Sequence, residues 1–136
     1  MHYRPLIPGD LLLRWKEGAW HLGIFMGDGT VLHNSPGIGE RVTSYAEYAD
    51  GKQVKARQPG SVKRAEIMER AWQIVRNPQQ YKHLTRNCEH TAYEAIEGKA
   101  KSPTVENLLW ALAIGTLIFL GVRYRKEIAK ALKSIK

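Results

Sequence analysis

The sequence has a single cysteine, Cys88, among its 136 residues. One cysteine excludes an internal disulfide framework and is typical of a protein from a reducing compartment. The opening MHYRPLIPGD has no apolar segment behind a basic start, so we expect no secretory signal. The chain also has no internal repeat and no low-complexity tract, and its length predicts one small domain with an appendage.

Metal-binding and phosphate-binding signatures are absent from the sequence as well. No group of cysteine and histidine residues has the spacing of metal ligands, so we predict neither a metal nor another cofactor. The segments GDG (27–29) and GIG (37–39) are too short and wrongly placed to be phosphate-binding loops.

Acidic residues are scarce relative to basic ones, and the formal net charge is +8. Residues 1–104 contain 15 basic and 11 acidic residues, while residues 105–136 contain 6 basic and 2 acidic residues. Each part therefore has a net charge of +4, although the second part is much shorter. A concentrated basic tail suits an anionic partner, either nucleic acid or anionic lipid.

Hydrophobic patterning in the first half predicts β-strands. Apolar runs separated by short turn sequences such as KEG and GDG are typical of hairpins. The predicted strands cover residues 10–15, 19–27, 30–35 and 53–58, and PGIGE (36–40) interrupts the pattern after the third.

Two helices are predicted in the second half. Met68, Ala71, Trp72 and Val75 follow helical spacing, which indicates an amphipathic helix over residues 63–76 that stops before Asn77-Pro78. A further helix begins at Cys88. Its expected N-cap is Asn87, its expected terminator is Gly98, and its shared face consists of Cys88, Ala92, Ala95 and Ile96.

The expected position of Cys88 in the first helical turn has a chemical consequence. Free N–H groups and the positive end of the helix dipole stabilise a thiolate, so we expect a lowered pKa for this thiol. The alternative is a small buried hydrophobic residue without chemistry, which is the commonest role of a lone cysteine.

A nucleophilic thiol usually requires an imidazole as its base. His21 and His33 are the candidates, because both lie inside predicted strands on either side of the GDG turn. A two-residue turn would place His33 opposite Ile24 and away from His21. A three-residue loop, Gly27–Gly29, would place His33 opposite Gly23 and diagonal to His21 on one face. The second register would allow one imidazole to act as base and the other to orient it.

The remaining histidines are weaker candidates. His2 is close to the N-terminus and His83 lies in a polar connector, so both are expected to be solvated. His90 is two residues beyond Cys88, which turns it about 200° away on a helix. We expect His90 to cap or pack the start of the helix.

Three sequence blocks resemble the lecithin retinol acyltransferase-like family: PGDLL (8–12), HLGIFMGDGTVLH (21–33) and NCEH (87–90). This family includes small phospholipase/acyltransferases and viral proteins with a related His-box and Asn-Cys motif. It belongs to the NlpC superfamily of circularly permuted papain-like cysteine enzymes. The resemblance extends from Pro8 to about Val105 and implies an α+β fold with an antiparallel sheet and helices.

The resemblance also implies residue roles and a reaction. Cys88 would be the nucleophile, His21 the general base and His33 the orienting third residue. A fatty acyl group would pass from a membrane phospholipid to Cys88 as a thioester, and then to water or an amine. Residues 1–102 would form the catalytic domain.

The C-terminal segment, residues 103–136, predicts a membrane-seeking helix with a basic tail. Ser102-Pro103 is a favourable helix start, and residues 108–122 form a run of fifteen residues without a charge. Trp110 and Tyr124 bracket this run as interfacial aromatic residues do. At 1.5 Å per residue the run is roughly 22 Å long, shorter than a hydrocarbon core of about 30 Å, so both a span and a shallow insertion fit.

We therefore expect a thiol acyltransferase or phospholipase A on the cytoplasmic face of a membrane, with membrane phospholipid as its partner and without nucleic-acid binding. Three alternatives stay open. The fold can serve a cysteine peptidase or amidase of NlpC type, or a membrane-anchored interaction module without turnover. The C-terminal helix can also be a buried element that holds a homo-oligomer together.

Overall fold

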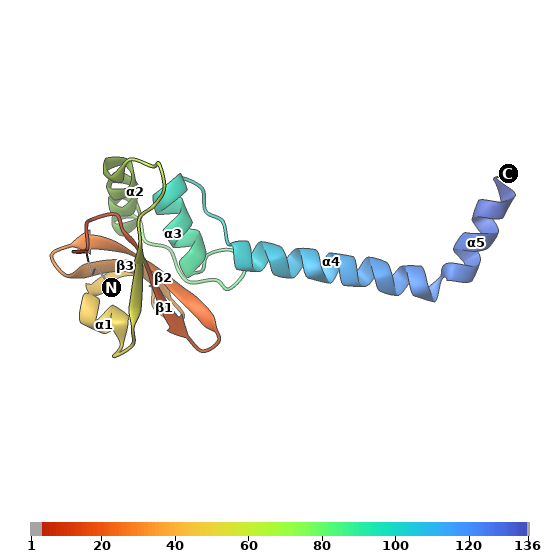
Figure 1. The fold of residues 1–136 in the computed structure, drawn as a ribbon, viewed down its shortest axis with the longest axis horizontal. Coiled ribbons are helices and arrows are strands. Elements are labelled where there is room, and N and C mark those ends of the chain that lie inside the picture. The colour runs from red at the N-terminus through yellow and green to blue at the C-terminus, as the bar shows by residue number, and fades with distance from the viewer. Residues whose placement is uncertain (1–3, 136) are drawn as a thin grey trace. The chain divides into compact units, whose positions relative to one another are not determined.

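The structure, a computed structural model, describes residues 4–135. The chain divides into two compact units, Met1–Ser102 and Pro103–Lys136. The first unit contains a sheet and three helices, and the second consists of two helices (Figure 1). His2 lies outside the described residues.

The first unit is built on a five-stranded antiparallel sheet with the strand order β4-β3-β2-β1-β5. This confirms the predicted α+β class with an antiparallel sheet. The strands are β1 (Leu11–Lys16), β2 (Ala19–Gly27), β3 (Thr30–Ser35), β4 (Gly39–Ser44) and β5 (Val54–Arg57).

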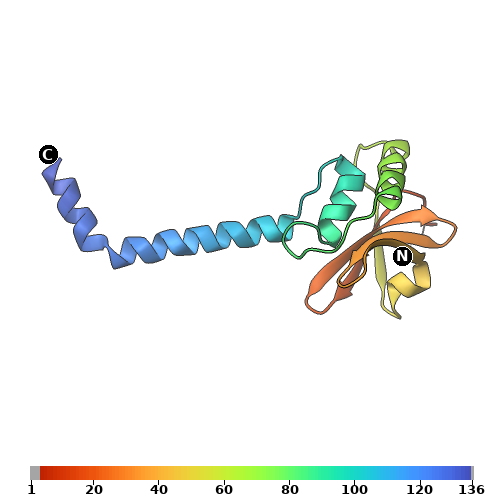
Figure 2. The same cartoon turned by 180° about the vertical axis from the view of Figure 1, so that it is seen from behind.

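Helices cover both faces of the sheet (Figures 1 and 2). The helices α2 (Arg64–Arg76) and α3 (Cys88–Glu97) pack on one face, where Ile67, Ala71 and Ala95 meet the strand leucines in the larger hydrophobic core. The short helix α1 (Tyr45–Ala49) supplies Tyr48 to a smaller core on the other face. Alternate strand residues therefore point into two different cores.

Of the two registers considered for the histidine strands, the structure has the one that places His33 opposite Gly23, but not the loop that was expected to produce it. Gly23 pairs with His33, as the three-residue loop would require. The connection is instead a two-residue turn, in which Asp28 and Gly29 are both left-handed, and a bulge between Phe25 and Gly27 shifts the register by one residue.

Two other expectations need correction. The sequence pattern missed β4, which begins at Gly39 within the PGIGE segment and pairs with β3 along its full length. In α2, Trp72 was expected on the buried face, yet it is 45% exposed. The buried face is centred on Ile67, Ala71 and Ile74, so the helix is rotated toward its aliphatic residues.

The second unit consists of α4 (Pro103–Arg123) and α5 (Arg125–Ser134). Helix α4 begins at the predicted proline and has 21 residues, and an 18-residue stretch within it has a mean hydropathy of 1.9, so the helix is long and apolar enough to cross a membrane. The helix ends at Arg123, and Tyr124 separates it from the basic amphipathic α5. The sequence pattern did not predict this break.

Candidate functional site

The N-terminus of α3 holds Cys88 in the position that the sequence predicts. The Asn87 side chain accepts hydrogen bonds from the backbone N–H groups of Glu89 (2.9 Å) and His90 (3.2 Å). The Asn87 N–H in turn donates to Nδ1 of His90 at 3.3 Å, which completes a capping box. His90 therefore has the expected capping role, and Gly98 ends the helix in a left-handed conformation.

His21 and His33 form a buried pair on the opposite face of the sheet from α3. Nε2 of His21 lies 3.0 Å from Nδ1 of His33. Ser35 Oγ lies 3.1 Å from the same Nδ1 of His33, and on the far side of the ring Nε2 of His33 lies 3.0 Å from Oγ1 of Thr43. Polar contacts thus hold His33 at both ring nitrogens and fix its orientation toward His21.

Tyr48 completes this pair, and the sequence analysis did not single it out. Its ring stacks on His21 at 5.5 Å between centroids and meets the His33 ring edge-on at 5.4 Å. Its hydroxyl lies 2.7 Å from the carbonyl oxygen of His21 and 3.0 Å from that of Leu12. A Cβ at Gly23 would come within 2.8 Å of the Tyr48 ring, so this approach requires glycine there.

A signal for the element that holds Tyr48 does exist in the sequence. Ser44-Tyr45-Ala46-Glu47 has the spacing of a capping box, and the Ser44 side chain accepts a hydrogen bond from the Glu47 N–H at 3.1 Å. The pattern identifies a helix start but not the partner of the tyrosine.

Cys88 and His21 line one surface cleft of about 240 Å³, together with Lys16, Glu17, Ala19, Trp20, Pro36 and Tyr81. The Cys88 Sγ lies 3.9 Å from the carbonyl oxygen of Trp20. Within residues 4–135 no hydrogen bond joins Cys88 to His21. The sulfur instead contacts the β2 backbone, because β3 pairs with β2 only from Gly23 onward and leaves the edge of residues 20–22 open.

The charge states differ from the sequence-based expectation. Burial raises the pKa of the Cys88 thiol, and this outweighs nearby backbone N–H groups, including that of Leu22, which lower it. The expected low-pKa thiolate is therefore wrong for the resting site. Burial also lowers the pKa of His21 to about 3 and that of His33 to about 4, and Arg14 adds to both shifts. At neutral pH all three groups are uncharged.

A second polar cluster fixes α3 and its preceding connector to the sheet. The buried carboxylate of Glu40 in β4 forms an ion pair with Arg86 (2.6 Å), accepts from Thr91 Oγ1 (2.7 Å) and accepts from the Gln79 N–H (2.7 Å). Asn34 donates to the carbonyl oxygen of Arg86 at 3.0 Å. These contacts hold the segment that leads into Cys88, and the sequence pattern gave no indication of them.

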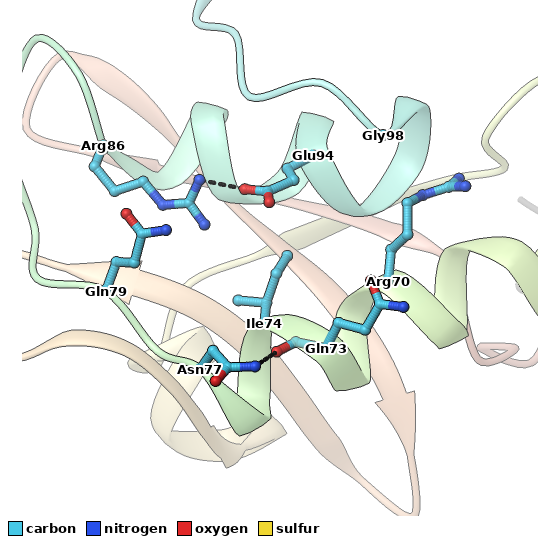
Figure 3. A pocket seen from close by; sticks show the side chains of 8 residues that line it. All are labelled: Arg70, Gln73, Ile74, Asn77, Gln79, Arg86, Glu94 and Gly98. Atoms are coloured by element: carbon cyan, nitrogen blue, oxygen red, sulfur yellow. Dashed lines mark hydrogen bonds and ion pairs between the residues drawn. The ribbon is translucent and has the colours of Figure 1, made fainter.

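Arg86 also lines a pocket of about 280 Å³, at whose α3 side it forms an ion pair with Glu94 (Figure 3). The other pocket-lining residues are Arg70, Gln73, Ile74, Asn77, Gln79 and Gly98. Arg70 donates to the carbonyl oxygens of Ala95 (2.8 Å) and Ile96 (2.6 Å) at the end of α3. The pocket thus lies between two arginines that anchor α3, and its charged groups are already engaged with the protein.

The other sequence candidates do not join the site. His83 is exposed and meets the Tyr81 ring edge-on at 5.0 Å. Among residues 4–135, no group of three His, Cys, Asp or Glu side chains is arranged to hold a metal ion.

Comparison with known proteins gives no assignment: no family model matches the chain, and no curated protein sequence matches it.

Proposed function

We propose that the protein is a thiol-dependent acyltransferase or phospholipase A of the permuted papain-like type. It would act on membrane phospholipid from the cytoplasmic face, with α4 as its anchor. The observation that carries this proposal is the convergence of Cys88, at a helix N-terminus, and His21, which is held by His33, on one cleft. A nucleophile, a base and an orienting group are the components of acyl transfer.

In the proposed reaction, the Cys88 sulfur attacks the ester carbonyl carbon of a phospholipid while the thiol proton passes to His21. The N–H of Cys88 stabilises the oxyanion, since helix N-termini present free donors. The ester bond then breaks, the departing lysophospholipid oxygen takes the proton from His21, and the acyl group stays on sulfur. Water or an amine then attacks the thioester carbonyl carbon and loses a proton to His21. The carbon–sulfur bond breaks, the fatty acid or amide leaves, and the sulfur takes the proton back from His21.

The tautomer of His21 follows from its role as base. We assign the proton of His21 to Nε2, which donates to Nδ1 of His33, while Nε2–H of His33 donates to Thr43. Nδ1 of His21 is then the free acceptor. Because both partners are uncharged at rest, proton transfer accompanies the attack. The thiol must first leave the Trp20 carbonyl, and catalytic hydrogen bonds often tighten only when substrate binds.

Intact mass spectrometry after incubation with phospholipid vesicles tests this function. The wild type is expected to gain a fatty-acyl mass that hydroxylamine removes, and Cys88→Ser is expected to lack the hydroxylamine-sensitive adduct. His21→Ala is expected to abolish acylation, whereas His33→Gln retains a measurable part because an orienting group is more replaceable than a base. Full acylation of His21→Ala would contradict the mechanism.

One observation favours a second candidate, a membrane-anchored interaction module without turnover. A neutral thiol beside a neutral imidazole lacks the preformed ion pair of a highly activated cysteine enzyme. The same mass measurement decides between the two, because a module without turnover would show no acyl adduct and release no lysophospholipid.

A further inference from the structure

Two tryptophans lie exposed at the turn end of the β1–β2 hairpin. Trp15 and Trp20 are cross-strand partners, and their rings meet edge-to-face at 5.1 Å between centroids. They are 49% and 39% exposed, although Leu13 and Leu22 on the same strand face are nearly fully buried. The turn of the hairpin lies away from α2 (Figure 1), and α3 approaches it at its first residue, Cys88, so the two rings extend this face beyond the helices that cover the core.

Lysines surround the two tryptophans. The Lys55 ammonium lies 5.0 Å from the centroid of the Trp20 ring. A surface hollow of about 350 Å³ is lined by Trp15, Glu17, Trp20, Lys52, Gln53 and Lys55. Lys16 lines the neighbouring Cys88 cleft.

Two acidic residues belong to the same region. Glu17 lines the hollow, and Asp50 lies 3.8 Å from Lys52 and 3.0 Å from the buried Arg14. Asp50 is therefore shared between Arg14 and Lys52. Glu17 is the other carboxylate of this region, and it is outnumbered by the three lysines named here and in the preceding paragraph. The surface around the tryptophans is positive overall.

This surface is continuous with the candidate active site, because Glu17 and Trp20 line both the hollow and the Cys88 cleft. Whatever binds the tryptophans therefore lies beside the thiol. Tryptophan is favoured at membrane–water interfaces, where its ring contacts apolar material and its N–H stays hydrated. Lysines near an anionic leaflet add electrostatic attraction.

We propose that Trp15, Trp20, Lys16, Lys52 and Lys55 form a docking surface, here called the Trp–Lys patch, for an anionic membrane. The tryptophans would lie at headgroup level and the lysines would contact lipid phosphates. The inference deepens the proposed function, since phospholipid would enter the Cys88 cleft from the docked membrane.

An anionic membrane fits this surface better than single-stranded nucleic acid does. Bases stack on open aromatic faces. Here the two indoles pack against each other and Lys55 lies over the Trp20 ring, so the open faces are reduced. The same chain also carries α4, which is long and apolar enough to cross a bilayer.

Tryptophan quenching by brominated lipid tests docking in the full chain. The chain has four tryptophans, so Trp72→Phe and Trp110→Phe leave only Trp15 and Trp20. Cys88→Ser is added to remove turnover, which makes the readout independent of acyl transfer. The protein is reconstituted in bilayer discs of brominated phosphatidylcholine, with or without about one-third phosphatidylserine.

We expect the two tryptophans to be quenched at least about twofold more in the anionic discs, and high salt to reduce the difference. Lys52→Glu with Lys55→Glu should return quenching to the level of the zwitterionic discs. The matched control, Lys63→Glu with Arg76→Glu, reverses two exposed charges on or beside α2 and should retain the wild-type difference. Lys52→Gln with Lys55→Gln should give an intermediate result.

Equal quenching in both lipids, or an unchanged difference after reversal of Lys52 and Lys55, would overturn the proposal. So would fluorescence that responds to single-stranded RNA but not to anionic lipid, which would assign the patch to nucleic acid. Because these measurements use Cys88→Ser, their failure leaves the proposed acyl transfer intact, and failure of the mass measurement leaves docking intact.

Discussion

Cys88 combines a favourable helix position with an unfavourable environment. The N-terminus of α3 directs free N–H groups toward the Cys88 sulfur, but burial removes water from the sulfur and raises the pKa of the thiol. The position of Cys88 in the first turn of α3 could be predicted from Asn87 and from the helical spacing that follows. The net effect on the pKa could not, because it depends on how strand β2 and the connector cover the sulfur.

Alkylation of Cys88 should therefore behave as that of a protonated thiol. We expect iodoacetamide to react slowly near pH 6 and the rate to rise only in the alkaline range, with a midpoint above that of the same cysteine in the urea-unfolded chain. The measurement is the pH dependence of the rate, followed by mass spectrometry. A plateau already reached at pH 6 would restore the thiolate interpretation.

The buried imidazoles make stability dependent on acid. In the folded chain His21 and His33 stay neutral down to about pH 3 and about pH 4, whereas in the unfolded chain they titrate near 6.5. Between these values the unfolded state binds more protons, so stability falls as the pH is lowered from about 6.5 toward 4. Each imidazole contributes at most about 1.4 kcal/mol per pH unit.

Urea unfolding of the full chain in detergent at pH 7 and pH 5 checks this slope. His33→Gln removes one of the two buried imidazoles and should flatten the dependence. His83→Gln is the matched control, since His83 is exposed, and it should leave the dependence unchanged. A His33→Gln chain that loses stability between pH 7 and pH 5 as steeply as the wild type would contradict the assignment.

At the scale of elements, the entry to α3 is held by the buried Glu40–Arg86 ion pair and its hydrogen bonds. Removing one partner of a buried pair leaves an uncompensated charge, which typically costs about 3–5 kcal/mol. We expect Glu40→Gln to lower the free energy of unfolding toward this range, reduced by the remaining pairing of Arg86 with Glu94. Urea titration measures the difference.

Glu47→Gln is the control for this substitution. It removes a carboxylate from a solvent-exposed pair with Arg41, and such pairs contribute about 0–1 kcal/mol. Equal losses in Glu40→Gln and Glu47→Gln would show that the Glu40 cluster does not hold the connector.

Local patterns predicted most elements but few of the contacts between them. Apolar runs bounded by turn sequences identified β1, β2, β3 and β5, and capping residues identified both ends of α3. Register arithmetic gave the diagonal placement of His21 and His33 as one of two alternatives and tied it to a three-residue loop, whereas a two-residue turn with a bulge produces it. The roles of Tyr48 and Glu40 could not be predicted from local patterns. Tyr48 packs against Gly23 and Glu40 pairs with Arg86, and both partners are distant in sequence.

Whole-molecule behaviour depends on what α4 and α5 add to the first unit. In α4 no residue is buried within the structure, and its exposed apolar side chains include Leu117, Phe119 and Val122. Inserting them into lipid would contribute several kcal/mol at about 25 cal/mol per Å² of apolar area. Basic residues in α5 would each add about 1 kcal/mol at an anionic surface, and only this part is sensitive to salt.

We therefore expect the full chain to stay with membranes through a high-salt wash and to leave only in detergent. A chain that ends at Ser102 keeps the hydrogen bonds of Ser102 with Asn87 and Glu89, so the α3 entry should stay intact. Its activity should fall far more on vesicles than on a short-chain, water-soluble ester, because the deletion removes access to lipid and leaves Cys88 and His21 in place. Vesicle activity that survives the deletion, or a full chain that is soluble and monomeric without detergent, would instead make the second unit a packing element and overturn its assignment as a membrane anchor.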